Sequence, residues 1–199
     1  MNERELVELV AASRSYRRFD EGRPVEEGLL RSLVDAARLA PTANNTQLLR
    51  FHLSTGAEAL EVMSHHRWAG LLKDWDGPEV GERPTAYVTI AGPAGTRTNA
   101  LRNQDAGIAA QTIMLAARAA GLVGCMVASF DAGLAAALGL DEKDLEPLLV
   151  CALGYPAPDE RVVVEGSGSE HGLAYWRERG GDDAWVHHVP KLGLDELLV

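Results

Sequence analysis

The chain has 199 residues, of which 46% are hydrophobic and 24% are charged, and this composition suits one globular domain over residues 1–199. Its formal net charge of −10 argues against nucleic acid and against an anionic membrane as partners. No apolar run approaches the roughly 20 residues that span a bilayer, and the first residues lack the apolar core of a signal peptide. We therefore expect a cytoplasmic protein whose cysteines, Cys125 and Cys151, are buried and reduced.

Apolar spacing and turn residues predict that helices and strands are mixed along the chain. The expected helices lie at 3–12, within 23–41, at 57–72, at 103–120 and near 130–140. The expected strands lie at 48–55, 84–92, 124–129 and 148–155, and a loop is expected at 73–83. The helix at 103–120 is apolar on most sides, so we expect it between layers. The pattern indicates α/β or α+β without fixing the order of the strands.

The basic stretch SRSYRRFD, residues 13–20, contrasts with the acidic balance of the chain. Arg14, Arg17 and Arg18 are crowded together, and Ser15 adds a hydroxyl group. Guanidinium groups suit phosphate geometry, and an anion between them would relieve their mutual repulsion. The stretch therefore predicts either an anion site or a set of solvated surface charges.

A second polar stretch, APTANNTQ at residues 40–47, joins an apolar helix to an apolar strand. Its amide and hydroxyl groups either cap a turn or face a polar ligand. A third stretch, GLVGCMVASFD at residues 121–131, has small residues that permit a flat ligand to approach the backbone. The same stretch is also typical of a buried strand that leads into a helix.

Other polar residues give weaker signals. The adjacent histidines of the pairs 65–66 and 187–188 point apart, so no metal site is predicted. Asp159 and Glu160 are expected at the solvated surface. Tyr175 and Trp176 stack either on a ligand or on a neighbouring side chain.

Five segments, taken in order, resemble the FMN-dependent nitroreductase family over nearly the whole chain. They are SRSYRRFD, APTANNTQ, DAGIAAQTIMLAARAAGL with GCMVASFD, LGYPAPDE and VHHVPK. The resemblance implies an α+β fold, with a mixed, mostly antiparallel sheet wrapped by helices in an intertwined homodimer. It also implies an enzyme that passes electrons from NADH or NADPH, through bound FMN, to a small acceptor such as a nitroaromatic, a quinone or a flavin.

The resemblance assigns the FMN site residue by residue. The phosphate and ribityl part falls on Arg14, Ser15, Arg17 and Lys191, with the N1–C2 side of the ring as an alternative for Arg17. The segment that reaches the partner subunit's flavin falls on Pro41, Thr42, Ala43, Asn45 and Gln47. The backbone near flavin N5 falls on Ala128 and Ser129, and Gly154 falls near the cofactor. Arg18 is expected in solvent.

Some positions depart from the family pattern. Ser13 stands where many members have an arginine, and Leu192 stands where many have a second C-terminal basic residue. Leu48 and Leu49 stand in place of Pro-Trp. The loss of two basic positions predicts weaker FMN binding than is usual in the family.

No catalytic side chain is expected, because a ping-pong transfer through flavin N5 needs only positioning, a backbone donor and positive charge near N1. The segment 64–76, with His65, His66, Trp68 and Trp75, is expected to select the acceptor. Two alternatives stay open at the level of sequence. They are a flavin-handling protein of the same fold with little turnover, and a cofactor-free interaction protein.

Overall fold

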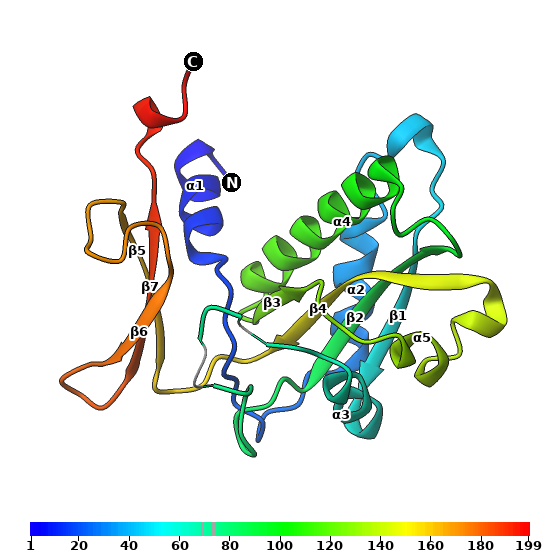
Figure 1. The fold of residues 1–199 in the computed structure, drawn as a ribbon, viewed down its shortest axis with the longest axis horizontal. Helices are drawn as coiled ribbons and strands as arrows, with labels where there is room; N and C mark the ends of the chain where they lie inside the picture. Colours follow the sequence, from blue (N-terminus) through cyan, green and yellow to red (C-terminus); the bar gives the residue numbers. More distant parts are fainter. Residues whose placement is uncertain (69, 73–74) are drawn as a thin grey trace.

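The computed structural model describes residues 1–68, 70–72 and 75–199, which form two sheets and the helices around them (Figure 1). The helices are α1 (Glu3–Ala12), α2 (Glu27–Ala37), α3 (Gly56–Ser64), α4 (Ala100–Ala119) and α5 (Gly133–Ala137). The short 3-10 helices are η1 (Ala43–Asn45), η2 (Asp141–Lys143) and η3 (Leu194–Glu196). The strands are β1 (Arg50–Thr55), β2 (Ala86–Pro93), β3 (Val123–Val127), β4 (Leu145–Gly154), β5 (Glu160–Gly166), β6 (Trp176–Arg179) and β7 (Trp185–Lys191).

The main sheet has the strand order β1-β2-β4-β3, and each neighbouring pair is antiparallel. Its central strand β2 is buried from Ala86 to Gly92, which explains its continuous apolar sequence. Because successive side chains of a strand point to opposite faces, Val88 belongs to one core and Tyr87 to the other.

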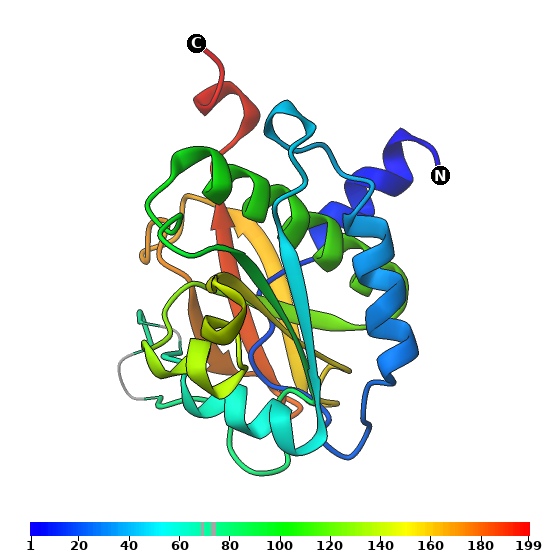
Figure 2. The ribbon, with the colours of Figure 1, turned by 90° about the vertical axis from the view of Figure 1, so that its right-hand side faces the viewer.

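Helices cover both faces of the main sheet, as Figure 2 shows. On one face, α2 and α4 place Leu30, Leu33 and Ile113 against the strands. On the other face, α3 and α5 contribute Val62 and Leu134 to a second core. The sheet is therefore held between two helical layers, and the expected α+β class is confirmed.

The last part of the chain forms a second sheet of three strands, in the order β5-β7-β6. In it β5 and β7 are parallel, whereas β6 and β7 are antiparallel. This C-terminal sheet stands apart from the main sheet, at the left of Figure 1. The polar, glycine-rich sequence after residue 165 did not predict it.

Two expected helices differ from those observed. The helix expected at 57–72 ends at Ser64, so that prediction is wrong beyond this point. Residues 65–67 instead pair with the chain after β3: the Asp131 amide donates to the His65 carbonyl, and the Arg67 amide donates to the Ser129 carbonyl. Residues 69, 73 and 74 lie outside the described part of the chain.

The helix expected at 103–120 is α4, which begins at Ala100 because the Asn99 side chain caps it. Its burial is one-sided, since Leu101 and Ile108 are exposed. No helix in the described part of the chain has the length and apolar character needed to cross a membrane. A single domain over 1–199 stays a prediction.

Candidate functional site

The basic stretch runs along the outer edge of the main sheet. Ser15 forms a parallel bridge with Gly124 of β3, and the Tyr16 amide donates to the Gly124 carbonyl at 2.9 Å. The alternation of an extended chain then turns Tyr16 and Arg18 inward, whereas Ser15 and Arg17 face outward. Neighbouring arginines therefore have different surroundings.

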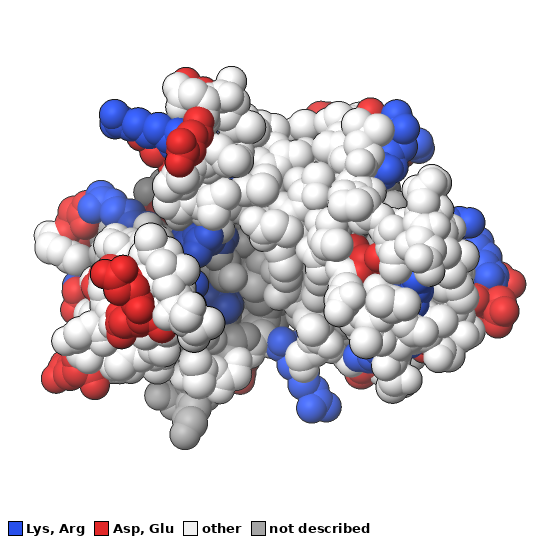
Figure 3. Space-filling view, turned by 90° about the horizontal axis from the view of Figure 1, so that it is seen from above, with Lys and Arg blue, Asp and Glu red and all other residues white. Residues whose placement is uncertain are grey.

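The outward side chains border a cleft of about 260 Å³ between the main sheet and the C-terminal sheet. Its lining residues are Ser13, Arg14, Ser15, Arg17, Gln111, Met114, Met126, Tyr175, His187, Val189 and Lys191. Figure 3 shows Lys and Arg side chains on the wall of a hollow in this face of the molecule. No carboxylate lies among these lining residues, so the cleft is basic although the chain is acidic. We call it the basic cleft.

The two arginines of the basic cleft each donate one hydrogen bond to a carbonyl group of the described residues, and that of Arg17 to Ser15 is long, at 3.5 Å. The Arg14 Nη2 atom donates to the Val10 carbonyl at 2.6 Å, but its buried Nε has no hydrogen-bond partner among the described residues. The Arg17 guanidinium lies 4.7 Å from the centre of the Tyr175 ring. A buried donor without a partner is costly, so this arrangement favours an anion.

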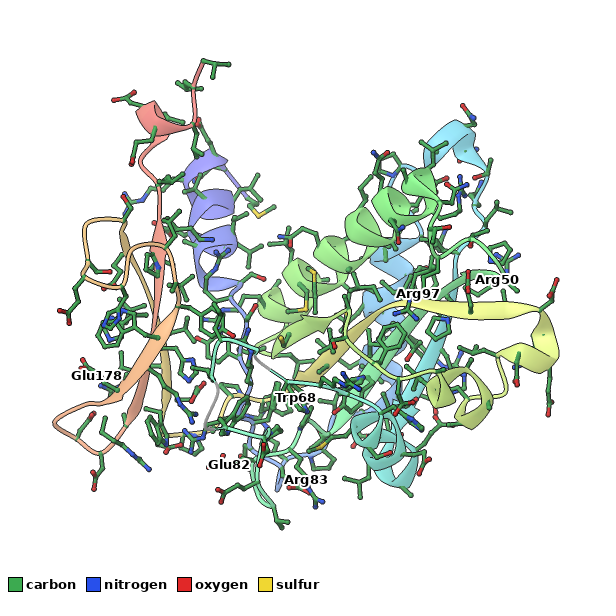
Figure 4. The ribbon with its side chains drawn as sticks, viewed as in Figure 1. Arg50, Trp68, Glu82, Arg83, Arg97 and Glu178 are labelled. Atoms are coloured by element: carbon green, nitrogen blue, oxygen red, sulfur yellow. The ribbon has the colours of Figure 1, made fainter. Side chains whose placement is uncertain are left out.

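The basic cleft continues into a second hollow of about 280 Å³, and Arg17, Met126 and Tyr175 line both. Ala128 and Ser129, which follow the end of β3, line this hollow. Trp68 lines it as well, and Figure 4 places Trp68 between the two sheets. The combined space suits an elongated ligand with an anionic end and a flat end.

Arg18 is buried, with 5% of its surface exposed, so the prediction that it lies in solvent is wrong. Its guanidinium donates to Glu82 (2.8 Å from Nε), to Asp159 (2.8 Å) and to Glu160 (3.1 Å). Burial opposes the charge of Arg18, but these carboxylates outweigh it and raise its pKa. Arg18 therefore belongs to an internal cluster of ion pairs.

Glu160 belongs to the same cluster, and its side chain is fully buried. The prediction that it lies at the solvated surface is wrong, because β5 brings it against the basic stretch. Burial raises the pKa of Glu160 to about 7, although Arg18 acts in the opposite direction. The cluster thus joins the C-terminal sheet to the stretch 13–20.

The second polar stretch has an unusual backbone. Asn44, Asn45 and Gln47 have φ angles of 52°, 52° and 49°, the left-handed region that costs energy for residues other than glycine. Asp105 of α4 secures the turn, because its Oδ1 accepts from the Ala43 amide at 2.8 Å. Strain that is secured in this way is common at functional sites.

This stretch does not border the basic cleft in the same chain. Pro41, Thr42 and Gln47 line a separate cavity of about 190 Å³, whereas Ala43 and Asn45 do not line it. Gly154 lines none of these spaces; a Cβ atom there would lie 2.9 Å from Cδ1 of Phe19. Of the expected site residues, the structure therefore gathers Arg14, Ser15, Arg17, Ala128, Ser129 and Lys191 around one continuous space.

Sequence reasoning missed several lining residues. His187, Val189 and Lys191 share one face of β7, and the two-residue spacing in VHHVPK was the available signal. Gln111 and Met114 come from α4 without a signal of their own. Among the described residues, no three His, Cys, Asp or Glu side chains are grouped as metal ligands.

The model of the nitroreductase family matches residues 10–155. The chain belongs to the nitroreductase family. The match ends before β5, so the C-terminal sheet that borders the basic cleft lies outside it. The expected family and fold are confirmed.

Individual relatives agree with this assignment. A curated protein of Methanothermobacter thermautotrophicus, provisionally named an NADH dehydrogenase or NAD(P)H nitroreductase, is 26% identical over 77% of this chain and 78% of its own. A nitroreductase family protein of Clostridium difficile is 25% identical, with a TM-score of 0.59 over 79% of this chain and 86% of its own. A provisional nitroreductase of Desulfovibrio desulfuricans, solved with FMN, is 23% identical, with a TM-score of 0.62 over 79% of this chain and 88% of its own.

Proposed function

We propose that this member of the nitroreductase family is an FMN-dependent oxidoreductase that takes electrons from NADH or NADPH and passes them to a small acceptor. The observation that carries the proposal is the continuous space from the basic cleft to Ala128 and Ser129. Its basic end suits a phosphate, and its other end suits a flat ring. The names of the relatives, which include an NAD(P)H nitroreductase and an FMN complex, support the same choice.

The residues of the chain bind and orient the cofactor. Arg14, Ser15 and Lys191 would hold the phosphate and the ribityl chain, and Arg17 would place positive charge beside the ring. The backbone of Ala128 and Ser129 would offer a donor at the ring edge. Gly154 would not contact the cofactor itself. It packs against Phe19 and so supports the basic stretch that would.

FMN, when bound, supplies the redox chemistry by accepting a hydride from the nicotinamide and giving electrons to the acceptor. Nicotinamide and acceptor use the same hollow in turn, which makes the kinetics ping-pong. This electron transfer requires neither a nucleophilic side chain nor a metal ion. From the segment 64–76, Arg67, Trp68 and Gly70 line the hollow and are placed to select the acceptor. His65, His66 and Trp75 do not line it.

The protein acts as a homodimer in this proposal. Pro41, Thr42, Ala43, Asn45 and Gln47 belong to the polar stretch that would reach the flavin of the other subunit. Two observations support this: the stretch has a strained backbone, and it borders no part of the basic cleft in its own chain. Exposed apolar residues on α1 and α4 also provide a surface for a partner.

The test is the colour and the redox response of the purified protein. We expect a yellow protein, after supply of FMN if necessary, whose flavin absorbance bleaches when NADH or NADPH is added without air. A protein that stays colourless with added FMN would refute the proposal and favour an interaction protein. A yellow protein that neither nicotinamide reduces would instead indicate flavin handling without turnover.

A further inference from the structure

The C-terminal sheet contributes a buried histidine to the basic cleft. His187 is only 3% exposed, yet its side chain lines the basic cleft together with Val189 and Lys191 of the same strand face. It lies outside the residues that match the nitroreductase family. We infer that His187 is a further donor for the ligand phosphate in the basic cleft; this inference rests on the proposed function.

The polar contacts of His187 favour such a role. Its Nε2 lies 3.3 Å from Oε1 of Glu160, but neither atom makes a hydrogen bond with the described residues. The other oxygen of Glu160 accepts from Arg18 at 3.1 Å. The carboxylate therefore sits between a fixed guanidinium and the imidazole, where it can stabilise a positive charge on His187.

The charges around His187 explain why its protonation depends on a bound anion. Arg17 and Arg18 of the basic stretch, Arg177 of β6 and the adjacent His188 oppose a positive charge on the ring, and Glu160 of β5 favours it. Burial, followed by these cations, lowers the pKa of His187 to about 4. A phosphate in the basic cleft would offset the arginines, so a bound anion and a proton on His187 stabilise each other.

Ser13 of the same cleft does not supply this donor. Its hydroxyl group is directed to the Met114 carbonyl of α4, at 3.5 Å. Ser13 is short and neutral, so it places no charge in the cleft. His187 adds a donor from the wall that β7 forms.

The neighbouring histidine provides a matched control. His188 points to the other face of the C-terminal sheet, where its ring stacks on Trp176 at 3.8 Å. Its nitrogens contact Glu165 at 3.1 Å and Glu178 at 3.4 Å. Figure 4 shows Glu178 on the side of this sheet away from the main sheet. H188N therefore changes the same strand at a side chain that does not line the basic cleft.

The test compares FMN with riboflavin, which lacks the phosphate. Both are titrated into flavin-free wild type, H187N and H188N, with flavin fluorescence as the readout and circular dichroism as the check of folding. We expect H187N to bind FMN about tenfold or more weakly and to bind riboflavin unchanged, because only FMN offers the charged acceptor. H188N should bind both flavins as the wild type does.

Three outcomes are informative in different ways. An H187N variant that loses FMN and riboflavin affinity equally, or loses neither, overturns the inference. A wild type that binds no flavin refutes the proposed function, and the inference fails with it. A loss confined to FMN in H187N supports both.

A pH series adds a second readout. FMN phosphate has a second pKa of about 6, and its ionisation affects both proteins alike. Between pH 5 and 8, we expect wild-type FMN affinity to fall relative to H187N as the pH rises, because His187, whose pKa is about 4 without the anion, must take up a proton when the anion binds. Identical pH profiles in the two proteins would contradict the linkage.

Discussion

At the scale of single residues, three arginines close together in sequence serve different purposes. Arg14 and Arg17 line the basic cleft, whereas Arg18 is buried among carboxylates. The two-residue alternation of the extended chain separates Arg17 from Arg18. A buried carboxylate such as Glu160 without its cation would be strongly destabilising, so Arg18 is unavailable to a ligand.

The half-buried imidazole of His66 makes stability depend on pH. Its ring packs edge-on against Tyr87 and Trp68, and both of its buried nitrogens have no hydrogen-bond partner among the described residues. Burial, followed by the neighbouring His65, lowers the pKa of His66 from 6.5 to about 4. Between these values the unfolded chain binds more protons than the folded chain, so stability falls as the pH falls.

We predict that H66F removes this part of the pH dependence while keeping an aromatic ring against Tyr87. Between pH 7.5 and pH 5, the free energy of unfolding of the wild type should fall by up to about 2 kcal/mol more than that of H66F. Urea unfolding at both pH values measures the difference. An equal fall in the two proteins would show that His66 is protonated in the folded state as easily as in the unfolded one.

At the scale of elements, the close pairing of β3 with β4 depends on the absence of a side chain at Gly124. A Cβ atom there would lie 2.4 Å from the Ala152 carbonyl oxygen and 2.8 Å from Cδ2 of Leu153. Both belong to β4, so neither β3 nor β4 can relax without disturbing the central sheet. Gly124 is also the residue to which Ser15 of the basic stretch forms its bridge.

We predict that G124A lowers the free energy of unfolding by about 1–3 kcal/mol, the usual cost of overpacking. The matched control is G28A, since Gly28 lies in the first turn of α2 with open space around its Cα. Alanine favours a helix, so G28A should be neutral or stabilising by less than about 1 kcal/mol. Urea unfolding of both variants would contradict the argument if G124A were as stable as G28A.

The elements that the sequence predicted well are those whose burial leaves a local signal. β2 and α4 bury long apolar runs, so their type and approximate bounds follow from the residues themselves. The C-terminal sheet carries no such signal, because β5 pairs in parallel with β7, far along the chain, and both strands are only partly buried. The end of α3 depends on long-range pairing as well, here with Ser129 and Asp131.

In the candidate site, too, some residues could be assigned from the sequence and others depend on how distant segments pair. The resemblance placed Arg14, Ser15, Arg17 and Lys191, and the structure brings all of them to one cleft. His187 could not be assigned in this way, because its place in the cleft depends on the orientation of β7. The role of Gly154 stays a prediction, since its close contact is with Phe19 and it lines none of these spaces.

At the scale of the whole molecule, one chain leaves apolar surface without a partner. Leu6, Val7 and Val10 are exposed on α1, a helix with no buried residue, and Leu101 and Ile108 are exposed on α4. Exposed apolar side chains that are grouped on one helix, as on α1, favour an interaction site. A symmetric dimer would cover it and could bring the strained stretch of each subunit to the basic cleft of the other.

We predict that two defective variants restore each other when they share a dimer. R14A/R17A removes the charges of the basic cleft, and N45A/Q47A alters the polar stretch, so each homodimer should retain little FMN.

If the stretch acts on the partner's cleft, a mixed dimer has one site with both defects and one intact site. Refolding the two variants together should then restore FMN to about a quarter of all sites, because half of the dimers are mixed. R31A/R161A is the control for arginine loss, since Arg31 of α2 and Arg161 of β5 are exposed and do not line the basic cleft, so their removal should leave FMN retention unchanged. Flavin absorbance per chain measures the outcome, and sedimentation confirms that the species is a dimer. No recovery on mixing would mean that each site is built from the residues of one chain.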